Sequence, residues 1–550
     1  MSKEKTISSL WKSFMDKVHK FELKNWLTVH KWQLAAGVIL IVGCLVRVVG
    51  ITKYPVGFNQ DEASVAYEAY AVTNYGIDRN GNSLPLHYVA WGSGQNAMYG
   101  WMIAPFVKIF GPTTLAARLP IALVGCITLI VAYFLFKKIL GDKKALVLLF
   151  IFAITPWHIM KSRWALDCNV FPDLIFWAIA ALYYGVTSVK RIYFIISSII
   201  IGLSSYAYGT SYVFIPVLYV AMYGYLVWKK KVSWKEAILY VSLAAVIALP
   251  MMIFVVINYF GLNTIHLGPI TIPKLDYNRF ATITSMNGNF FSNCYHNLIG
   301  ALGVTLKQSD EVVLNAVEYF GLFYGFSLPF IIAGIVYSIR DKEVFCKLIN
   351  AFMIAALAVA AFVEPNINRI NVLWIPMIFY LGYGILRLCR TRRNICIVCG
   401  CYSIGFLFFV WTYFGSYQKV LRDENVTFYG LEEAIDFTSK LDSQEIYISE
   451  KINQPYIYYL WYNAYDPNLY LQQRNITEKE VMFQEITSIG DVHFNLPEKL
   501  KKGSVYIIEK SRIFELAESK KNHLEQTNEG GVIKIKDFEV AEFGNYYVLY

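Results

Sequence analysis

Long apolar runs recur along the chain from about residue 34 to about residue 415, and short polar segments separate them. A run of about twenty such residues forms a helix long enough to cross roughly 30 Å of hydrocarbon. The runs begin near residues 34, 114, 145, 170, 191, 212, 237, 316, 344, 370 and 395. The pattern therefore predicts a polytopic α-helical membrane protein with about eleven transmembrane helices.

Basic residues mark every second loop between these runs. They are Lys137, Lys138, Lys143, Lys144, Lys190, Arg191, Lys229, Lys230, Lys231, Lys235, Arg340, Lys342, Lys347, Arg387, Arg390, Arg392 and Arg393. The positive-inside rule places these loops in the cytoplasm, together with the basic N-terminal segment 1–33, which lacks a small-residue cleavage site. The extracytoplasmic side of the plasma membrane then receives the loops 53–113 and 258–315 and the end of the chain.

The C-terminal part of the chain, residues 416–550, differs in character from the membrane part, 34–415. It is rich in charged residues and carries short strand-like patterns such as EIYIS (445–449), SVYIIEK (504–510) and NYYVLY (545–550). Helical patterns such as LEEAIDFTSKL lie between them. Such alternation predicts a soluble α/β domain on the extracytoplasmic side. Within loop 53–113, the apolar segment 98–110 is too short to span and predicts an interfacial or re-entrant helix.

Composition narrows the class of function. The chain is 56% hydrophobic and 16% charged, and its net charge of +10 is concentrated in the short loops, as topology signals are. No zinc-finger spacing or base-stacking motif is present, so nucleic acid is not an expected partner. The sequence also lacks a Walker A loop, a dinucleotide glycine fingerprint, a zincin His pair and a lipase nucleophile elbow. This argues against ATP or a cytoplasmic nucleotide sugar as substrate.

An acidic pair, Asp61 and Glu62, follows the first apolar run on the predicted outer side. A structural interpretation is available, because Asn59 can cap a helix and Glu62 then completes a capping box. Adjacent residues on a helix do not share a face, so at most one of the pair is expected to point into a site. Glu68 lies seven residues after Asp61 and is a candidate to share its face.

A second polar cluster, HIMKSRWALDCN (158–169), lies at a predicted membrane boundary. Its polar members are Lys161, Arg163, Asp167 and Asn169. On a helix, Arg163 and Asp167 would be four residues apart and could simply pair with each other. The functional alternative is that the cluster faces a polar cavity, as ionisable groups near membrane depth usually do.

A third cluster, EPNINRIN (364–371), places Arg369 at the outer mouth of a predicted span. An arginine there can bind a phosphate oxygen or extend to lipid headgroups; Arg279 in loop 258–315 is open to the same two interpretations. Aromatic residues also gather on this side, either as an interfacial belt or as a platform for a sugar or a polyprenyl chain. They include Trp91, Tyr99, Trp101, Tyr206, Tyr208 and Tyr212.

These segments, in their order, resemble a known group. The order is GFNQDEASVAYEAY, PLHYVAWGSGQNAMYGW, FGPTTLAARLPIALVG and SRWALDCNVFPD, followed much later by PNINRINVLWIP. It is similar to that of the polyprenyl-phosphate-dependent glycosyltransferases of the GT-C fold, within them the protein O-mannosyltransferase and aminoarabinose transferase group. The similarity is best over residues 34–210 and continues as a pattern of spans to about residue 415.

The resemblance implies transfer of a sugar from a polyprenyl phosphate to an acceptor in the cell envelope, by an inverting displacement at the outer membrane face. Asp61 matches the catalytic aspartate of the group's first loop, and Asp167 its second acidic position, with Glu62 and Glu68 as supporting acids. The donor phosphate would be bound by Arg163, Arg369, Lys161 and Arg279. The substrate would contact His87, Tyr99, Asn169, Tyr206 and Tyr208.

Metal dependence and two alternative classes of function remain to be considered. Some members use a divalent metal such as Mg²⁺ or Mn²⁺, for which Asp61, Glu62 and Asp167 would supply oxygen ligands; metal dependence is left open. The alternatives from other classes are a transporter or flippase and a non-catalytic envelope-assembly protein. A transporter predicts paired half-repeats with polar residues at the bilayer midplane, whereas the polar residues here collect at the outer mouth.

Overall fold

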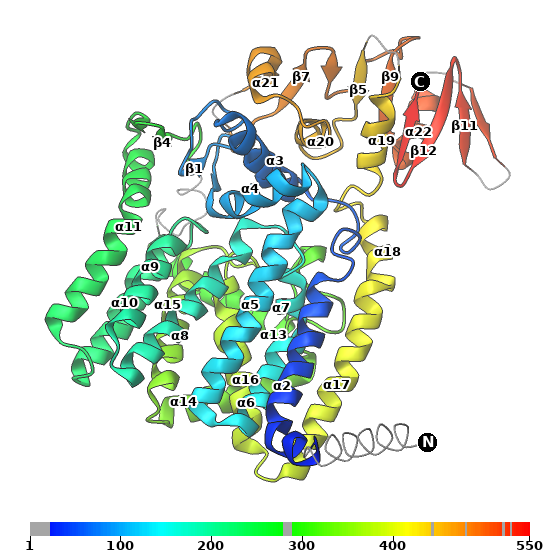
Figure 1. Cartoon of the computed structure of the whole chain (residues 1–550). Helices are drawn as coiled ribbons and strands as arrows, with labels where there is room; N and C mark the ends of the chain where they lie inside the picture. The colour runs from blue at the N-terminus through cyan, green and yellow to red at the C-terminus, as the bar shows by residue number, and fades with distance from the viewer. Residues whose placement is uncertain (1–22, 279–288, 442–444, 479–480, 520–522, 528–530) are drawn as a thin grey trace, which may run out of the picture.

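The computed structural model describes residues 23–278, 289–441, 445–478, 481–519, 523–527 and 531–550. A bundle of long helices forms most of the molecule, and a mixed α/β domain lies at one end of it (Figure 1). We call this end of the bundle the domain-bearing face.

Eight helical segments among the described residues are long and apolar enough to span a membrane. They coincide with or overlap α2 (Leu23–Val48), α5 (Thr114–Leu140), α8 (Phe171–Ser188), α10 (Ser211–Trp228), α11 (Trp234–Phe260), α15 (Val344–Phe362), α16 (Trp374–Leu388) and α17 (Arg392–Phe414). The other predicted runs contain shorter helices: α6 (Asp142–Ile154) continued by α7 (Pro156–Lys161), α9 (Arg191–Ser204) and α14 (Leu328–Arg340). The predicted multi-span helical fold is confirmed.

The run predicted to begin near residue 316 starts later than expected. Residues 313–327 form two short 3₁₀ turns, η2 (Val313–Asn315) and η3 (Gly325–Ser327), joined by loop, and the helix α14 begins only at Leu328. Tyr319 and Tyr324 have φ of 68° and 70°, which interrupts any regular helix before that point.

Small residues allow two of these helices to pack closely. A Cβ added to Gly334 of α14 would lie 1.9 Å from the carbonyl oxygen of Tyr380, and one added to Gly384 of α16 would lie 1.9 Å from that of Phe330. The backbones therefore touch directly. This is typical of helix pairs in membranes, where close van der Waals packing at small residues favours association because no hydrophobic effect acts between the helices.

The connections at the domain-bearing face contain structure of their own. The predicted loop 53–113 forms α3 (Gln60–Tyr75), a hairpin of β1 (His87–Tyr88) with β2 (Gln95–Asn96), and α4 (Met98–Phe110). The short apolar helix predicted over 98–110 is thus present. The predicted loop 258–315 contains the hairpin β3 (Ile265–Leu267) with β4 (Ile270–Ile272), then α13 (Phe290–Lys307) and η2.

The C-terminal part forms a nine-stranded mixed sheet in the order β10-β11-β12-β13-β9-β5-β8-β7-β6. The predicted strands appear as β5 (Ile446–Ile448), β9 (Val505–Glu509) and β13 (Tyr546–Leu549), and the predicted helix as α19 (Leu431–Thr438). The remaining strands are β6 (Arg474–Ile476), β7 (Ile486–Ile489), β8 (Val492–His493), β10 (Leu524–Gln526), β11 (Val532–Ile535) and β12 (Phe538–Phe543). The remaining helices are α18 (Ser416–Asp423), α20 (Pro455–Tyr462), α21 (Pro467–Gln473) and α22 (Lys510–Ser519).

The C-terminal domain packs on the helix α3, which follows the first span. The hydroxyl of Tyr67 donates to the carbonyl oxygen of Tyr465 (2.9 Å), and that of Tyr70 to the carbonyl oxygen of Ala464 (2.7 Å). Buried residues of α3 and α20 belong to the same hydrophobic core as the membrane helices. The domain is therefore an integral part of the domain-bearing face.

Candidate active site

Three charged side chains from distant parts of the sequence line one cavity at the domain-bearing face. The cavity measures about 390 Å³, and Asp61, Asp167 and Arg369 are the charged residues among those that line it. They come from the start of α3, from η1 (Asp167–Asn169) and from the turn between α15 and α16. The fold thus brings together one predicted residue from each polar cluster of the sequence.

Asp61 is placed by the first turn of α3. Its backbone N–H donates to the side chain of Asn59 (3.0 Å), which caps the helix, and its carbonyl oxygen accepts from Gln95 Nε2 (3.4 Å). The Gln95 side chain in turn accepts from the hydroxyl of Ser64 (2.9 Å). A carboxylate at this position is stabilised by the positive end of the helix dipole.

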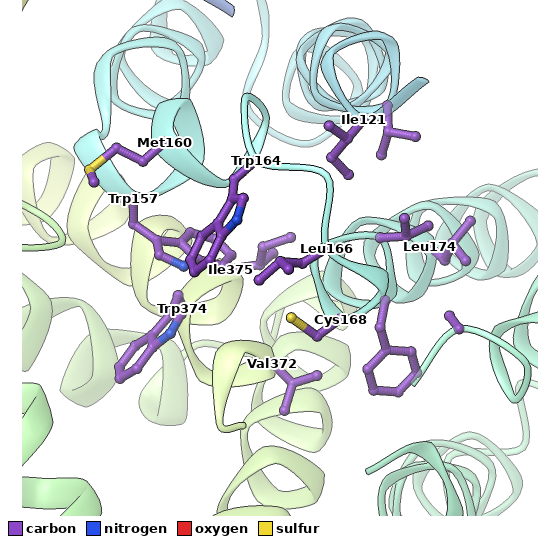
Figure 2. Close-up of a cluster of buried hydrophobic side chains, with 14 of the residues drawn as sticks. Ile121, Trp157, Met160, Trp164, Leu166, Cys168, Leu174, Val372, Trp374 and Ile375 are labelled. Carbon is purple, nitrogen blue, oxygen red and sulfur yellow. The ribbon is translucent and has the colours of Figure 1, made fainter. Parts of the chain in front are cut away.

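Asp167 is held by backbone donors at the start of η1. Its carboxylate accepts from the N–H of Cys168 (2.7 Å) and from the N–H of Asn96 (3.3 Å). Its neighbours Leu166 and Cys168 point into a buried apolar cluster with Trp164, Val372 and Trp374 (Figure 2). Asp167 is half-buried between these two buried neighbours, and it lines the cavity.

Two further bonds fix the backbone beneath Asp167. Asn371 Nδ2 donates to the carbonyl oxygen of Cys168 (2.7 Å), and Lys161 Nζ donates to that of Asn169 (3.2 Å). Both donors are buried. Because buried hydrogen bonds of this kind are costly to break, we infer that η1 is rigid.

Arg369 reaches the cavity from an exposed turn. Its guanidinium pairs with Glu364 (2.9 Å), whose side chain is 77% exposed, and the side chain of Asn366 accepts from its backbone N–H (2.8 Å). An ion pair with so exposed a partner contributes little to stability. The guanidinium can therefore exchange Glu364 for an anionic ligand at small cost.

The rest of the cavity wall mixes uncharged polar side chains with apolar ones. Its uncharged polar side chains are His87, Ser93, Gln95, Asn96, Tyr208, Thr210, Tyr212, Asn278, Asn366 and Asn368. Ser93 Oγ and Thr210 Oγ1 are buried and have no hydrogen-bond partner within the described part of the chain. Buried hydroxyls are almost always bonded, so these two indicate where a polar ligand would bind.

His87 is neutral in this wall. Its ring stacks on Phe254 (centroids 4.1 Å apart), and Nδ1 lies 3.0 Å from the carbonyl oxygen of Tyr88. Burial lowers the pKa of His87 to about 4. Since a carbonyl oxygen only accepts, Nδ1 carries the proton and Nε2 is left as an acceptor. Gly94 permits this arrangement, because its φ is +90° and a Cβ there would lie 2.6 Å from the His87 ring.

The structure corrects the placement of both predicted supporting acids. Glu62 does not line the cavity, since it forms a buried ion pair with Arg118 (2.8 Å) and completes the capping box predicted as its structural alternative. Glu68 is likewise buried and pairs with Arg79 (3.1 Å). Glu62 is occupied by an arginine 56 residues later and Glu68 by one 11 residues later, and neither carboxylate lines the cavity.

The two basic residues of the second cluster are also placed elsewhere. Lys161 forms a buried ion pair with Asp173, which also bonds His158. Arg163 donates to the carbonyl oxygens of Val46 at the end of α2 and of Val49 and Tyr54 in the segment that follows it (2.9–3.0 Å). Neither lines the cavity. Arg163 therefore stabilises a helix end instead of binding phosphate or pairing with Asp167, because unpaired terminal carbonyls need donors.

Of the predicted substrate contacts, His87 and Tyr208 line the cavity, whereas three others do not. Tyr99 donates to the carbonyl oxygen of Ala117 (2.6 Å), Tyr206 to that of Ile247 (2.8 Å), and Asn169 to that of Trp164 (3.0 Å). These side chains fasten elements to one another. Arg279 lies outside the described residues.

The predicted three-carboxylate metal set is not assembled. Asp61 and Asp167 line the cavity, but Glu62 is bound to Arg118. Across the described ranges, no group of three or more His, Cys, Asp or Glu side chains is placed to hold a metal ion. Glu62 thus lies away from the other two carboxylates, in its pair with Arg118.

Several lining residues carried no signal that sequence reasoning used. Ser93, Gln95 and Asn96 lie in the segment GSGQN, which belongs to the family-like pattern but singles out none of the three. Thr210 begins a span, and Asn366 and Asn368 flank Arg369 in a turn. Their proximity to Asp61 and Asp167 depends on how the helices pack, which short motifs do not encode.

Comparison with known proteins supports this architecture. Residues 95–257 match the model of the family described as dolichyl-phosphate-mannose-protein mannosyltransferase. A comparison with curated protein sequences gives no significant match. The structure is similar to that of ArnT from Cupriavidus metallidurans bound to undecaprenyl phosphate, with a TM-score of 0.59 at 12% identity, over 94% of this chain and 98% of that one.

The apo state of the same ArnT gives a TM-score of 0.57 at 12% identity, over 95% of this chain and 98% of that one. The archaeal oligosaccharyltransferase AglB from Archaeoglobus fulgidus, in complex with an inhibitory peptide and a dolichol-phosphate, gives 0.47 at 11% identity, over 80% and 64% of the two chains. The chain is therefore a multi-span membrane protein with the fold of ArnT, and its residues 95–257 carry the match to the dolichyl-phosphate-mannose-protein mannosyltransferase family.

Proposed function

We propose that the protein is a glycosyltransferase that moves a sugar from a polyprenyl phosphate to an acceptor of the cell envelope. The observation that carries the proposal is the meeting of Asp61, Asp167 and Arg369 in one cavity. The family match and the ArnT fold support the same reaction class. The basic loops of the sequence favour an extracytoplasmic domain-bearing face, where a lipid-linked donor would present its sugar.

In the proposed reaction, Asp61 acts as the general base. It accepts the proton of the acceptor hydroxyl while the acceptor oxygen forms a bond to the anomeric carbon. The bond between that carbon and the phosphate oxygen breaks, and polyprenyl phosphate leaves with the electron pair. A single displacement of this kind inverts the anomeric centre and requires only one base, so the two carboxylates need not stand at the spacing of a retaining enzyme.

Asp167 and Arg369 have separate proposed roles. Arg369 stabilises the negative charge of the donor and of the leaving phosphate, because a guanidinium forms strong charge-assisted bonds to phosphate oxygens. Asp167 already accepts two backbone N–H bonds, which hold it in one orientation. We assign it the role of orienting a substrate hydroxyl by accepting its proton in a hydrogen bond.

Arg369→Gln is expected to weaken the binding of polyprenyl phosphate. A hydrogen bond to a charged group contributes about 1.5–3 kcal/mol, which corresponds to roughly a 10- to 100-fold loss of affinity. Titration of the purified protein in nanodiscs with undecaprenyl phosphate measures this loss. Glu364→Gln is the matched control, since it removes the partner of Arg369 and leaves the guanidinium in place. Equal affinity of Arg369→Gln and wild type would contradict the assignment.

The hydroxyls of Ser93 and Thr210 in the cavity wall, which have no hydrogen-bond partner among the described residues, lead to a second prediction. Thr210→Val keeps the shape of the side chain and removes a hydroxyl that we expect to bond the transferred sugar. One neutral hydrogen bond contributes about 0.5–1.5 kcal/mol, so kcat/KM for the sugar donor should fall roughly 2- to 10-fold, with the affinity for sugar-free undecaprenyl phosphate unchanged. Thr305→Val in α13, whose hydroxyl bonds the carbonyl of Ala301 in its own helix, is the control and should not change kcat/KM.

The proposed function is tested by an assay for the release of polyprenyl phosphate. The purified protein is incubated with a panel of undecaprenyl-phosphate sugars, with cell-envelope extract as acceptor, and the free lipid phosphate is quantified. Release that depends on the extract, with label transferred to an extract component, is the expected result. No release with any donor, from protein that remains folded and binds undecaprenyl phosphate, would favour transport or assembly instead.

A further inference from the structure

The C-terminal domain contributes a residue that supports the wall of the cavity. Gln484, which is 4% exposed, lies in the connection before β7. Its backbone N–H donates to the carbonyl oxygen of Trp91 (2.9 Å), and its side-chain Nε2 donates to the carboxylate of Asp276 (2.6 Å). One residue of the domain therefore holds two separate segments of the membrane part.

Both of these segments line the cavity. Trp91 belongs to the loop between β1 and β2, and Asp276 lies between the lining residues Leu275 and Asn278. The segments are also bonded to each other, since Tyr277 N–H donates to the carbonyl oxygen of Gly92 (2.9 Å). Gln484 thus closes a three-part junction directly behind the cavity wall.

The fit at this junction is tight. A Cβ added to Gly92 would lie 2.7 Å from the Gln484 carboxamide, and Gly92 has a φ of +90°. The wall loop can follow its path only because no side chain is present there. The position of the loop is therefore set by direct contact with the C-terminal domain.

A column of rings and cations joins the same two parts. The Arg79 guanidinium lies over the rings of Trp91 (4.4 Å) and Tyr456 (5.7 Å). Tyr456 stacks on Tyr470 with an interplanar angle of 2°, and the Arg474 guanidinium lies over Tyr470 (5.2 Å). Cation–π contacts gain strength when they are shielded from water, and Arg79 is fully buried here. The column runs from the C-terminal domain to the cavity-lining Trp91.

We propose that Gln484 is a positioning residue, through which the C-terminal domain sets the cavity wall for sugar transfer. The inference rests on the proposed transferase function. The proposed role goes beyond attachment of the domain, because the hydrogen bonds of Tyr67 and Tyr70 already attach the domain to α3. Gln484 touches wall segments instead of substrate, so its effect on the reaction is indirect.

An exchange of charge across the junction tests the proposal. Gln484→Glu places a second carboxylate against Asp276, and the repulsion should displace the wall loop; displacements of about 1 Å can lower rates 100-fold. We expect kcat to fall at least tenfold, with the affinity for undecaprenyl phosphate within about twofold of wild type. Adding Asp276→Asn restores the hydrogen bond with donor and acceptor exchanged, because the amide now at position 276 donates to the carboxylate at position 484. The double variant should recover kcat to within about threefold.

Tyr67→Phe provides the matched control, because it removes a bond between the same two parts away from the wall. It should lower thermal stability slightly and leave kcat unchanged. An unchanged kcat in Gln484→Glu, or a loss that the double variant does not recover, would overturn the proposal.

Hydrogen–deuterium exchange gives a readout that is independent of activity. Amide exchange in the peptide that covers residues 89–96 should accelerate in Gln484→Glu and return to the wild-type rate in the double variant. If the wild type releases no polyprenyl phosphate but the exchange rates follow this pattern, the proposed function fails while the positioning by Gln484 stands. If exchange is unchanged, the positioning role fails whatever the activity.

Discussion

Asp61→Asn is expected to lower the rate of sugar transfer by about 10²- to 10⁴-fold while the protein remains folded. General base catalysis contributes about 10²- to 10⁴-fold to a rate, and asparagine has no basic oxygen to accept the acceptor proton. The contacts that place residue 61 use its backbone N–H and carbonyl groups, which asparagine retains. The loss should therefore appear in kcat, with little change in the affinity for undecaprenyl phosphate. Release of lipid phosphate in single-turnover conditions measures it.

The control for Asp61→Asn is Asp436→Asn, which removes a carboxylate from an exposed ion pair with Lys440 in the C-terminal domain. It should retain full activity. Transfer by Asp61→Asn at more than about a tenth of the wild-type rate would exclude Asp61 as the base. Asp167 would then be the next candidate, since it is the other carboxylate that lines the cavity.

The fold was predictable because its signals are local. A run of about twenty apolar residues suffices for a span, and strand patterns such as SVYIIEK indicate β9 without reference to the rest of the chain. The helix of the run near residue 316 starts later than predicted because apolarity alone does not make a helix. Gly321, at a φ of +61°, and two tyrosines at positive φ break it into turns.

The site was predictable only in part, because neighbouring residues of the same type have different surroundings. Asp61 and Glu62 differ by one position, yet the first lines the cavity and the second meets Arg118, 56 residues later. Lys161 and Arg163 are basic residues at a membrane boundary, as a phosphate site requires. Their actual partners, Asp173 and the carbonyls of α2, are determined by helix packing.

Removing either partner of the Glu62–Arg118 pair is expected to have the largest effect on stability. Both side chains are 0% exposed. All the N–H donors of the Arg118 guanidinium have acceptors, which are Glu62 and the carbonyl oxygens of Ile51, Pro55 and Gly57. Glu62 also accepts from the N–H groups of Asn59 and Ala165. The pair therefore joins α3, α5, the end of the first span and the segment before Asp167.

Glu62→Gln should accordingly destabilise the protein by about 3–5 kcal/mol, because an uncompensated charge is left buried. We expect a large drop in the melting temperature, measured on the detergent-solubilised protein. Glu62→Gln combined with Arg118→Met removes both charges and should recover the part of the loss that comes from the uncompensated charge. A catalytic Glu62 predicts the opposite pattern, with an unchanged melting temperature, a lost kcat and no recovery in the double variant. The two measurements together therefore separate the carboxylate that holds the site together from its neighbour Asp61, to which we assign the chemistry.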